Sequence, residues 1–211
     1  MDRAFQRERL LLIWPGRIEP DKVLAQEIVS AGVDILEYRP EEGEPNETVY
    51  RALERLRNEA PLIVNNRLTV AKEVDGVWVG EGDIAVASAR KELGEDARIG
   101  RTVRSVKSLE VAEREGADWV GAGALSPSPL KRDAPLMEEA VAREIANLSN
   151  TPCFGVGGVL LGEGVETYLL WGFRRFALSG AILRAKNPPF EAMRWQNLLA
   201  ENLTNAPTVS S

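Results

Sequence analysis

One loop carries the residue types that are best suited to binding a phosphate group. The segment WVGAGALSPSPLKRD (119–133) begins as an apolar run and continues with the hydroxyls of Ser126 and Ser128 and the cation Lys131. The prolines between them restrict the loop and lower the entropy cost of holding its donors in place. Hydroxyl and ammonium donors held in this way suit a phosphate or a pyrophosphate. Ordinary solvated loops contain the same residue types, so the loop by itself leaves that alternative open.

Two pairs of small residues at the ends of apolar runs suit a second phosphate. Gly157-Gly158 follows CFGV, and Ser179-Gly180 follows RFAL. Because glycine has no Cβ, backbone N–H groups in such pairs can approach an oxyanion closely. A tight turn is the alternative explanation for either pair. Their occurrence after consecutive predicted strands favours a phosphate cradle.

Four further polar residues also follow apolar runs. Asp83 comes after GVWVGEG, where its carboxylate suits either a magnesium ion or the N-cap of the next helix. Arg39 ends DILEYR, where it could face a diphosphate or pair with a carboxylate such as Glu37. Asn65 and Asn66 end LIVNN, where a helix cap is the alternative to a binding role.

The residue types that are rare or absent in the chain exclude several kinds of catalytic and metal site. The 211 residues include no histidine, which excludes Ser-His and Cys-His catalysis and any imidazole general base. The one cysteine, Cys153, excludes an internal disulfide and a multi-cysteine zinc site. The formal charge of −6 does not favour a nucleic-acid partner. No apolar run approaches a membrane span and the N-terminus lacks an apolar signal core, so we expect a cytoplasmic protein with no membrane partner.

The elements that would position these residues alternate along the whole chain. Short apolar runs bounded by turn formers predict eight strands, at 10–14, 34–39, 62–66, 76–80, 98–103, 119–124, 153–158 and 175–180. Helix-period segments between them imply parallel pairing through helical crossovers. Between the third and fourth predicted strands there is room only for a short helix, around 68–74. A last helix is expected near 189–201.

This order predicts one α/β domain, a single (β/α)8 TIM barrel over residues 1–201, followed by a disordered tail at 202–211. A doubly wound open sheet is the alternative. In a barrel the carboxyl ends of all strands meet at one rim, where active sites lie. The candidate residues therefore converge there, together with Thr102 at the end of the fifth predicted strand.

The chain resembles the thiamine phosphate synthase and TenI family over nearly the whole predicted barrel. The segments that carry the resemblance are LEYRPEEG, LIVNNRLTVAKEVDGVWVGEGD, IGRTVRSVKSLEVAEREGADWVGAGALSPSPLKRDAP, CFGVGGV and RFALSGAI. Synthases of this family join hydroxymethylpyrimidine diphosphate to a thiazole phosphate and release pyrophosphate. The resemblance implies a transferase of thiamine biosynthesis with Mg2+ as cofactor and small phosphorylated substrates as partners; a homo-oligomer is left open.

Carried over by position, the resemblance implies two binding regions. Arg39 and Lys131 would be catalytic, and Asp83 and Asn66 would hold the metal. Asn65 and Ser128 would complete the diphosphate and magnesium side, and Gly157, Gly158, Ser179 and Gly180 the thiazole-phosphate side. Thr102 stands where the family usually has a serine, and Ser126 is a substrate-binding candidate through its place in the loop.

Several residues depart from the family pattern, among them Trp14-Pro15, which stand where the family has a small polar pair. Glu37, Glu41, Asn66 and Leu130 stand where the family has glutamine, lysine, aspartate and threonine. The loss of one cation and one metal carboxylate predicts weak synthase activity. The alternative is a non-catalytic TenI-like protein that binds thiazole phosphate or thiamine phosphate. The third hypothesis is another phosphate-binding barrel enzyme, such as an isomerase or an aldolase. Such an enzyme would need a general base or a Schiff-base lysine inside the barrel.

Overall fold

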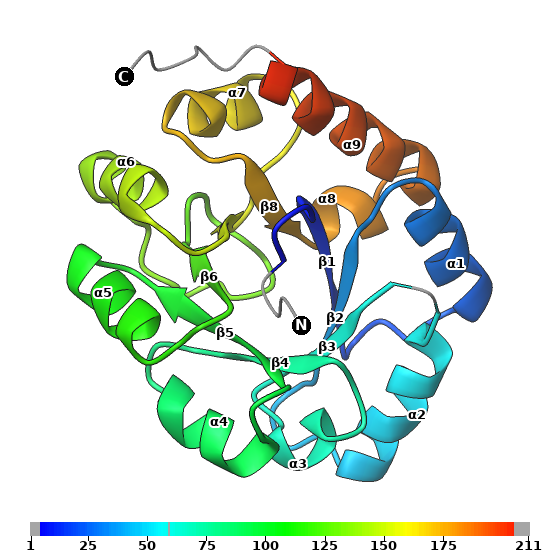
Figure 1. The fold of residues 1–211 in the computed structure, drawn as a ribbon. Helices are drawn as coiled ribbons and strands as arrows, with labels where there is room; N and C mark the ends of the chain where they lie inside the picture. Colours follow the sequence, from blue (N-terminus) through cyan, green and yellow to red (C-terminus); the bar gives the residue numbers. More distant parts are fainter. Residues whose placement is uncertain (1–4, 59, 205–211) are drawn as a thin grey trace.

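Eight parallel strands close into a barrel in the computed structural model, which describes residues 5–58 and 60–204. The strands are β1 (Leu10–Pro15), β2 (Ile35–Arg39), β3 (Leu62–Asn65), β4 (Gly76–Val79), β5 (Arg98–Val103), β6 (Trp119–Ala122), β7 (Cys153–Val156) and β8 (Arg175–Leu178). Each strand pairs with the next, and β8 pairs with β1 to complete the ring (Figure 1). The (β/α)8 prediction is confirmed, and the open-sheet alternative is wrong because the β1–β8 ladder leaves no free edge.

Helices form the outer ring in Figure 1. They are α1 (Lys22–Ser30), α2 (Asn46–Leu56), α3 (Leu68–Ala71), α4 (Val86–Leu93), α5 (Val106–Arg114), α6 (Glu139–Leu148), α7 (Glu163–Leu170), α8 (Gly180–Leu183) and α9 (Pro188–Thr204). The third helix is short, as expected, whereas the sequence did not predict α8. Helix α9 continues through 202–204, so the predicted tail begins too early there, and 205–211 lie outside the described residues.

Two tryptophans determine where the barrel interior needs glycine. A Cβ on Gly100 would lie 2.0 Å from Cε2 of Trp119, and one on Gly121 would lie 2.0 Å from Cζ2 of Trp78. The two indole rings meet edge to face, with centroids 6.2 Å apart. Glycines in β5 and β6 therefore leave the room that the large interior side chains occupy.

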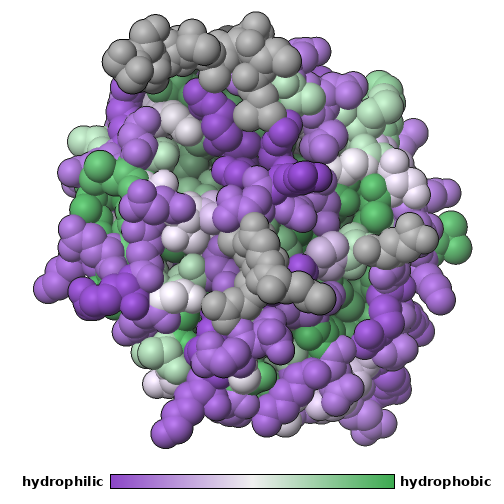
Figure 2. All heavy atoms as spheres, in the orientation of Figure 1, coloured by the Kyte–Doolittle hydropathy of each residue, from purple (hydrophilic) through white to green (hydrophobic). Residues whose placement is uncertain are grey.

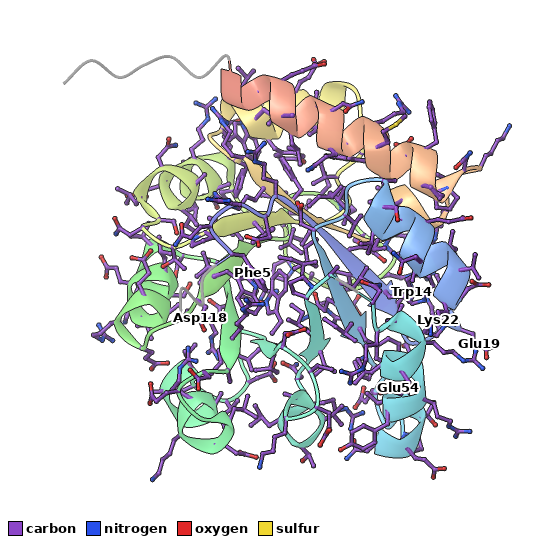
Figure 3. The ribbon with its side chains drawn as sticks, turned by 45° about the vertical axis from the view of Figure 1, so that its right-hand side comes forward. Phe5, Trp14, Glu19, Lys22, Glu54 and Asp118 are labelled. Carbon is purple, nitrogen blue, oxygen red and sulfur yellow. The ribbon has the colours of Figure 1, made fainter. Side chains whose placement is uncertain are left out.

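Side chains close the amino end of the barrel. Phe5 is buried and packs against Trp119 with ring centroids 4.8 Å apart; Figure 3 labels it within the ring of strands. The guanidinium of Arg98 lies over the Phe5 ring, with Cζ 5.0 Å from its centroid. Arg175 donates to the backbone oxygens of Gln6 and Glu8 and so holds the N-terminal segment in place.

Hydrophilic side chains predominate on the face that Figure 2 shows, and hydrophobic ones are scattered between them. The most exposed large apolar residues, Leu170 and Val23, belong to different helices, α7 and α1. None of the helices in the described ranges is long and apolar enough to cross a membrane.

Candidate active site

A cleft of about 550 Å³ opens at the carboxyl ends of the strands, and residues that lie in or directly after each of the eight strands line it. It brings together eleven of the twelve residues that the sequence selects: Arg39, Asn65, Asn66, Asp83, Thr102, Ser128, Lys131, Gly157, Gly158, Ser179 and Gly180. The barrel thus gathers the candidates into one site, as its topology requires. Their individual roles stay predictions.

Ser126 is the candidate that does not line the cleft. Its Oγ lies 2.5 Å from the hydroxyl of Tyr168, which donates in turn to the backbone oxygen of Leu125 at 3.0 Å. These bonds tie the loop after β6 to α7. Ser128 does line the cleft, and its Oγ accepts a hydrogen bond of 3.2 Å from the N–H of Leu130. The two hydroxyls of the loop therefore have different surroundings.

The Gly157-Gly158 pair allows the same loop to pack on the end of β7. The N–H of Gly158 donates to Ser126 O at 3.1 Å, so this amide is engaged within the protein. A Cβ on Gly158 would lie 1.9 Å from the backbone oxygen of Pro127, and Gly157 has a φ of 143°. Glycine is needed here for close approach and backbone conformation, which is a different reason from the free donor that the sequence suggests.

A buried carboxyl group lies next to the cleft on β2. Glu37 is 1% exposed, and its Oε1 accepts a hydrogen bond of 2.9 Å from Nδ2 of Asn65. Its Oε2 is buried and has no hydrogen-bond partner in the described part of the chain. Burial raises the pKa of Glu37 to about 7, although Arg39 and the Asn65 bond act to lower it. Because one N–H of Asn65 Nδ2 is engaged by Glu37, the second N–H and Oδ1 are left for a ligand.

Asn66 and Asp83 lie side by side at the ends of β3 and β4. Oδ1 of Asn66 and Oδ2 of Asp83 both accept from the N–H of Gly80, at 3.1 and 2.8 Å. The capping alternative is wrong for these residues, because the N-caps of α3 and α4 are Arg67 and Ala85. The N–H of Gly80 therefore holds the two side chains together at the rim and lies at the point where their oxygens meet.

An ion pair that the sequence analysis missed borders the cleft near β5. Nη1 of Arg104 lies 3.2 Å from Oε2 of Glu81, and its Nε donates to the backbone oxygen of Gly123 at 3.1 Å. Thr102, two residues earlier, accepts a hydrogen bond of 3.1 Å from Nε1 of Trp78. Arg104 and Glu81 each follow a predicted strand within two residues, a position that could have drawn attention to them.

Three cations that line the cleft are unpartnered. No side-chain hydrogen bond or ion pair is formed by Arg39, Lys131 or Arg184 within the ranges that the structure describes. Arg101 differs, because at the same rim its guanidinium donates to two backbone oxygens at 2.6 Å. Arg184 is the second cation that the sequence analysis did not select.

The charge of the lining contrasts with the charge of the whole protein. Four cationic side chains line the cleft against two carboxylates, whereas the chain as a whole has a formal charge of −6. Cys153 offers no nucleophile, because it is buried in β7 and burial raises its pKa to about 12. This arrangement suits the binding of anions and the stabilisation of developing negative charge.

A closed (β/α)8 barrel with a cationic cleft at the carboxyl ends of its strands is typical of phosphate-binding barrel enzymes. A sequence model of one family, described as thiamine monophosphate synthase, matches residues 11–182. The chain belongs to this family, which confirms the resemblance found in the sequence.

Relatives of known identity agree with that membership. A thiamine-phosphate synthase from Clostridium perfringens is 33% identical over 202 residues, covering 92% of this chain and 97% of the relative. One from Methanobrevibacter smithii is 30% identical over 184 residues, covering 84% and 86%. Among solved structures, a thiamine phosphate pyrophosphorylase from Pyrococcus furiosus matches with a TM-score of 0.82 at 23% identity, covering 96% of this chain and 98% of that one.

Proposed function

We propose that this protein is a thiamine phosphate synthase that joins hydroxymethylpyrimidine diphosphate to thiazole phosphate and releases pyrophosphate. The observation that carries the proposal is the rim cleft with three unpartnered cations, in a chain of this family. Both substrates and both products are phosphorylated, so each brings negative charge that these cations can balance.

The reaction exchanges one bond for another at the methylene carbon of the pyrimidine. The C–O bond to the diphosphate breaks, and its electron pair leaves with pyrophosphate. The lone pair of the thiazole nitrogen then forms the new C–N bond. This nitrogen carries no proton to be removed, so a cleft without histidine is compatible with the chemistry. The protein has to stabilise the charge that develops on the leaving oxygen.

Arg39 and Lys131 are the residues that we assign to the leaving pyrophosphate. Both line the cleft, and neither forms a side-chain hydrogen bond or ion pair in the described residues, although Arg39 interacts electrostatically with Glu37. Their N–H donors are therefore available to a ligand. Lys131 lies on the loop that Pro127 and Pro129 restrict, which lowers the cost of holding the ammonium group in place. Oδ1 of Asn65, left open by the Glu37 bond, suits an N–H donor of the pyrimidine.

Asn66 and Asp83 fit a magnesium ion that shares its coordination with a diphosphate. Each accepts from the N–H of Gly80 through one oxygen, which holds the two side chains together at the rim, and Oδ1 of Asp83 has no hydrogen-bond partner among the described residues. Mg2+ commonly takes one or two carboxylates together with substrate phosphates and water. Among the described residues, no group of three or more Cys, Asp or Glu side chains could hold a metal ion without such a substrate. When bound, the ion would supply positive charge at the leaving pyrophosphate.

The experiment is a measurement of thiamine phosphate formation by the purified protein from the two substrates, with and without magnesium. We expect product that depends on magnesium. Calorimetry with thiazole phosphate alone serves as the control for binding. Micromolar binding without detectable product would instead support the TenI-like binding protein. The cytoplasmic location and the oligomeric state stay predictions.

A further inference from the structure

A cation outside the family-derived set lies at the β8 side of the cleft. Arg184 directly follows α8, and it lines the cleft together with Ser179 and Gly180. We propose that Arg184 binds the phosphate group of thiazole phosphate and sets the preference for a phosphorylated over an unphosphorylated thiazole. The assignment rests on the proposed synthase function and adds to it a residue for substrate specificity.

The backbone of α8 directs the Arg184 side chain back over Gly180. The N–H of Arg184 donates to Gly180 O at 3.2 Å, so the two residues lie one helical turn apart on the same face. Cδ and Nε of Arg184 lie 3.5 Å, and Cζ 3.9 Å, from the point where a Cβ of Gly180 would be. Long helical side chains lean in this direction, toward the helix N-terminus. The guanidinium therefore covers the end of β8, the region where barrel enzymes often bind phosphate.

The guanidinium of Arg184 forms no hydrogen bond within the described residues, unlike those of Arg90 and Arg175. Arg90 donates to the carboxylate of Asp118 at 2.7 Å, and Arg175 donates to two backbone oxygens of the N-terminal segment. Arg184 makes no side-chain hydrogen bond or ion pair anywhere in 5–58 or 60–204. Its side chain is exposed, so its N–H donors meet water until an anion displaces that water.

The topology indicates which phosphate Arg184 meets. In the closed ring, β8 and β4 are separated by three strands in either direction, so they lie on opposite sides of the barrel. The Asn66 and Asp83 pair, which fits magnesium and the diphosphate, belongs to the ends of β3 and β4. Arg184 lies across the cleft from that pair, which favours the phosphate monoester as its ligand.

A guanidinium at this position distinguishes phosphate from alcohol. Arginine can present two parallel N–H donors to a phosphate, while a lysine ammonium provides charge without this fork. An unphosphorylated thiazole alcohol has no anion for Arg184 to bind. Loss of the guanidinium should therefore reduce affinity for thiazole phosphate and leave affinity for the alcohol unchanged.

The experiment compares wild type, Arg184→Gln, Arg184→Lys and the control Lys186→Gln. Lys186 is an exposed cation two residues away that does not line the cleft, so the control removes the same charge from the same segment. Calorimetry with thiazole phosphate and with thiazole alcohol, without the pyrimidine substrate, gives the affinities. We expect Arg184→Gln to weaken thiazole phosphate binding roughly 10- to 100-fold, the range of a charged hydrogen bond, with partial rescue by lysine.

Steady-state kinetics on the same proteins should show a higher KM for thiazole phosphate and an unchanged KM for the pyrimidine diphosphate. Equal losses for phosphate and alcohol, an effect confined to the pyrimidine diphosphate, or equal behaviour of the Arg184 and Lys186 variants would overturn the assignment. So would a wild type that does not bind thiazole phosphate. If the wild type makes no product, but Arg184→Gln binds thiazole phosphate more weakly than the wild type does, the synthase proposal is wrong and the assignment of Arg184 stands.

Discussion

The two ends of the barrel use arginine in different ways. At the amino end, Arg98 lies over the ring of Phe5 and Arg175 donates to backbone oxygens of Gln6 and Glu8. Each of these cations is occupied by a neighbouring group of the protein. They close the barrel and hold the segment that precedes β1.

At the carboxyl end, the cleft of about 550 Å³ has Arg39, Lys131 and Arg184 in its lining, and none of the three forms a side-chain hydrogen bond or ion pair among the described residues. The difference teaches that the number of cations at a barrel end says little about function. Arg101 and Arg104 at the carboxyl end are engaged by protein groups as well. The feature that marks the functional end is the presence of further cleft-lining cations that form no such bond. This agrees with the general division of such barrels into a stabilising amino face and a catalytic carboxyl face.

Truncation of Phe5 should give the largest effect on stability. Phe5→Ala removes a buried ring from the amino end and should lower the free energy of unfolding by about 3–5 kcal/mol. Because the residue is remote from the cleft, kcat of the remaining folded protein should be unchanged. Urea unfolding and active-enzyme titration measure the two quantities. Phe190→Ala, which removes a ring that is 53% exposed, is the control and should be nearly neutral. A loss of kcat at unchanged stability would contradict the division between the ends.

Lys131→Ala should lower the rate of the reaction without changing the stability of the protein, which is the opposite of the effect expected for Phe5→Ala. Loss of one preorganised charge at the leaving group typically costs about 2.7–4 kcal/mol of transition-state stabilisation, or roughly 10²–10³ in rate. The urea midpoint should stay that of the wild type, because Lys131 is exposed and unpartnered in the described residues. Arg132→Ala removes the adjacent exposed cation, which does not line the cleft, and should retain most of the rate. Similar losses in both variants would mean that general loop charge, and not Lys131, is responsible.

Glu37 lies between the closed interior and the open rim and should link stability to pH. Its pKa is raised from 4.5 to about 7, so between these values the unfolded chain releases a proton that the folded protein keeps. The free energy of unfolding therefore falls as pH rises through this window. Glu37→Gln removes the ionisation, and its glutamine oxygen can still accept from Asn65. The stability advantage of the variant should grow from pH 4.5 to 7, reaching roughly 3 kcal/mol, and then level off.

Urea unfolding of both proteins between pH 4 and 9 checks this prediction. Glu110→Gln, at an exposed position of α5, is the matched control and should give a difference that does not vary in this window. A constant difference for Glu37→Gln would show that the buried carboxyl does not titrate differently in the folded and unfolded chains.

Sequence patterns predicted the strands well because strands buried on both faces are short continuous apolar runs. All eight predicted strands overlap the observed ones, and the short α3 followed from the spacing between β3 and β4. Helix α8 was missed because its four residues are too few to show a helical period. Arg184 was missed with it, since its position over Gly180 depends on that turn.

The sequence predicts that the candidate residues lie together at one rim, but it does not predict the individual contacts that each of them makes. Strand order and the carboxyl-end rule bring the candidates to one rim. Sequence alone could not show that the Ser126 hydroxyl bonds Tyr168, or that the Gly158 amide bonds Ser126. These contacts join α7 and β7 to a loop distant in sequence, and residue types do not specify them.

The smallest expected effect concerns the metal position at the open end. Asn66→Asp places a second carboxylate beside Asp83, and the backbone tolerates it because asparagine and aspartate both adopt the φ of 53° found there. A second anionic oxygen should lower the magnesium concentration that gives half-maximal activity by about tenfold, equivalent to ~1.4 kcal/mol. Magnesium titrations at fixed substrate measure it. Glu41→Lys should do less than the family pattern suggests, because Glu41 does not line the cleft.

The control for Asn66→Asp is Asn187→Asp, which adds the same charge outside the cleft and should leave the magnesium titration unchanged. An Asn66→Asp titration that coincides with that of the Asn187 control would remove Asn66 and its neighbour from the metal site and leave the three unpartnered cations as the functional feature of the carboxyl end.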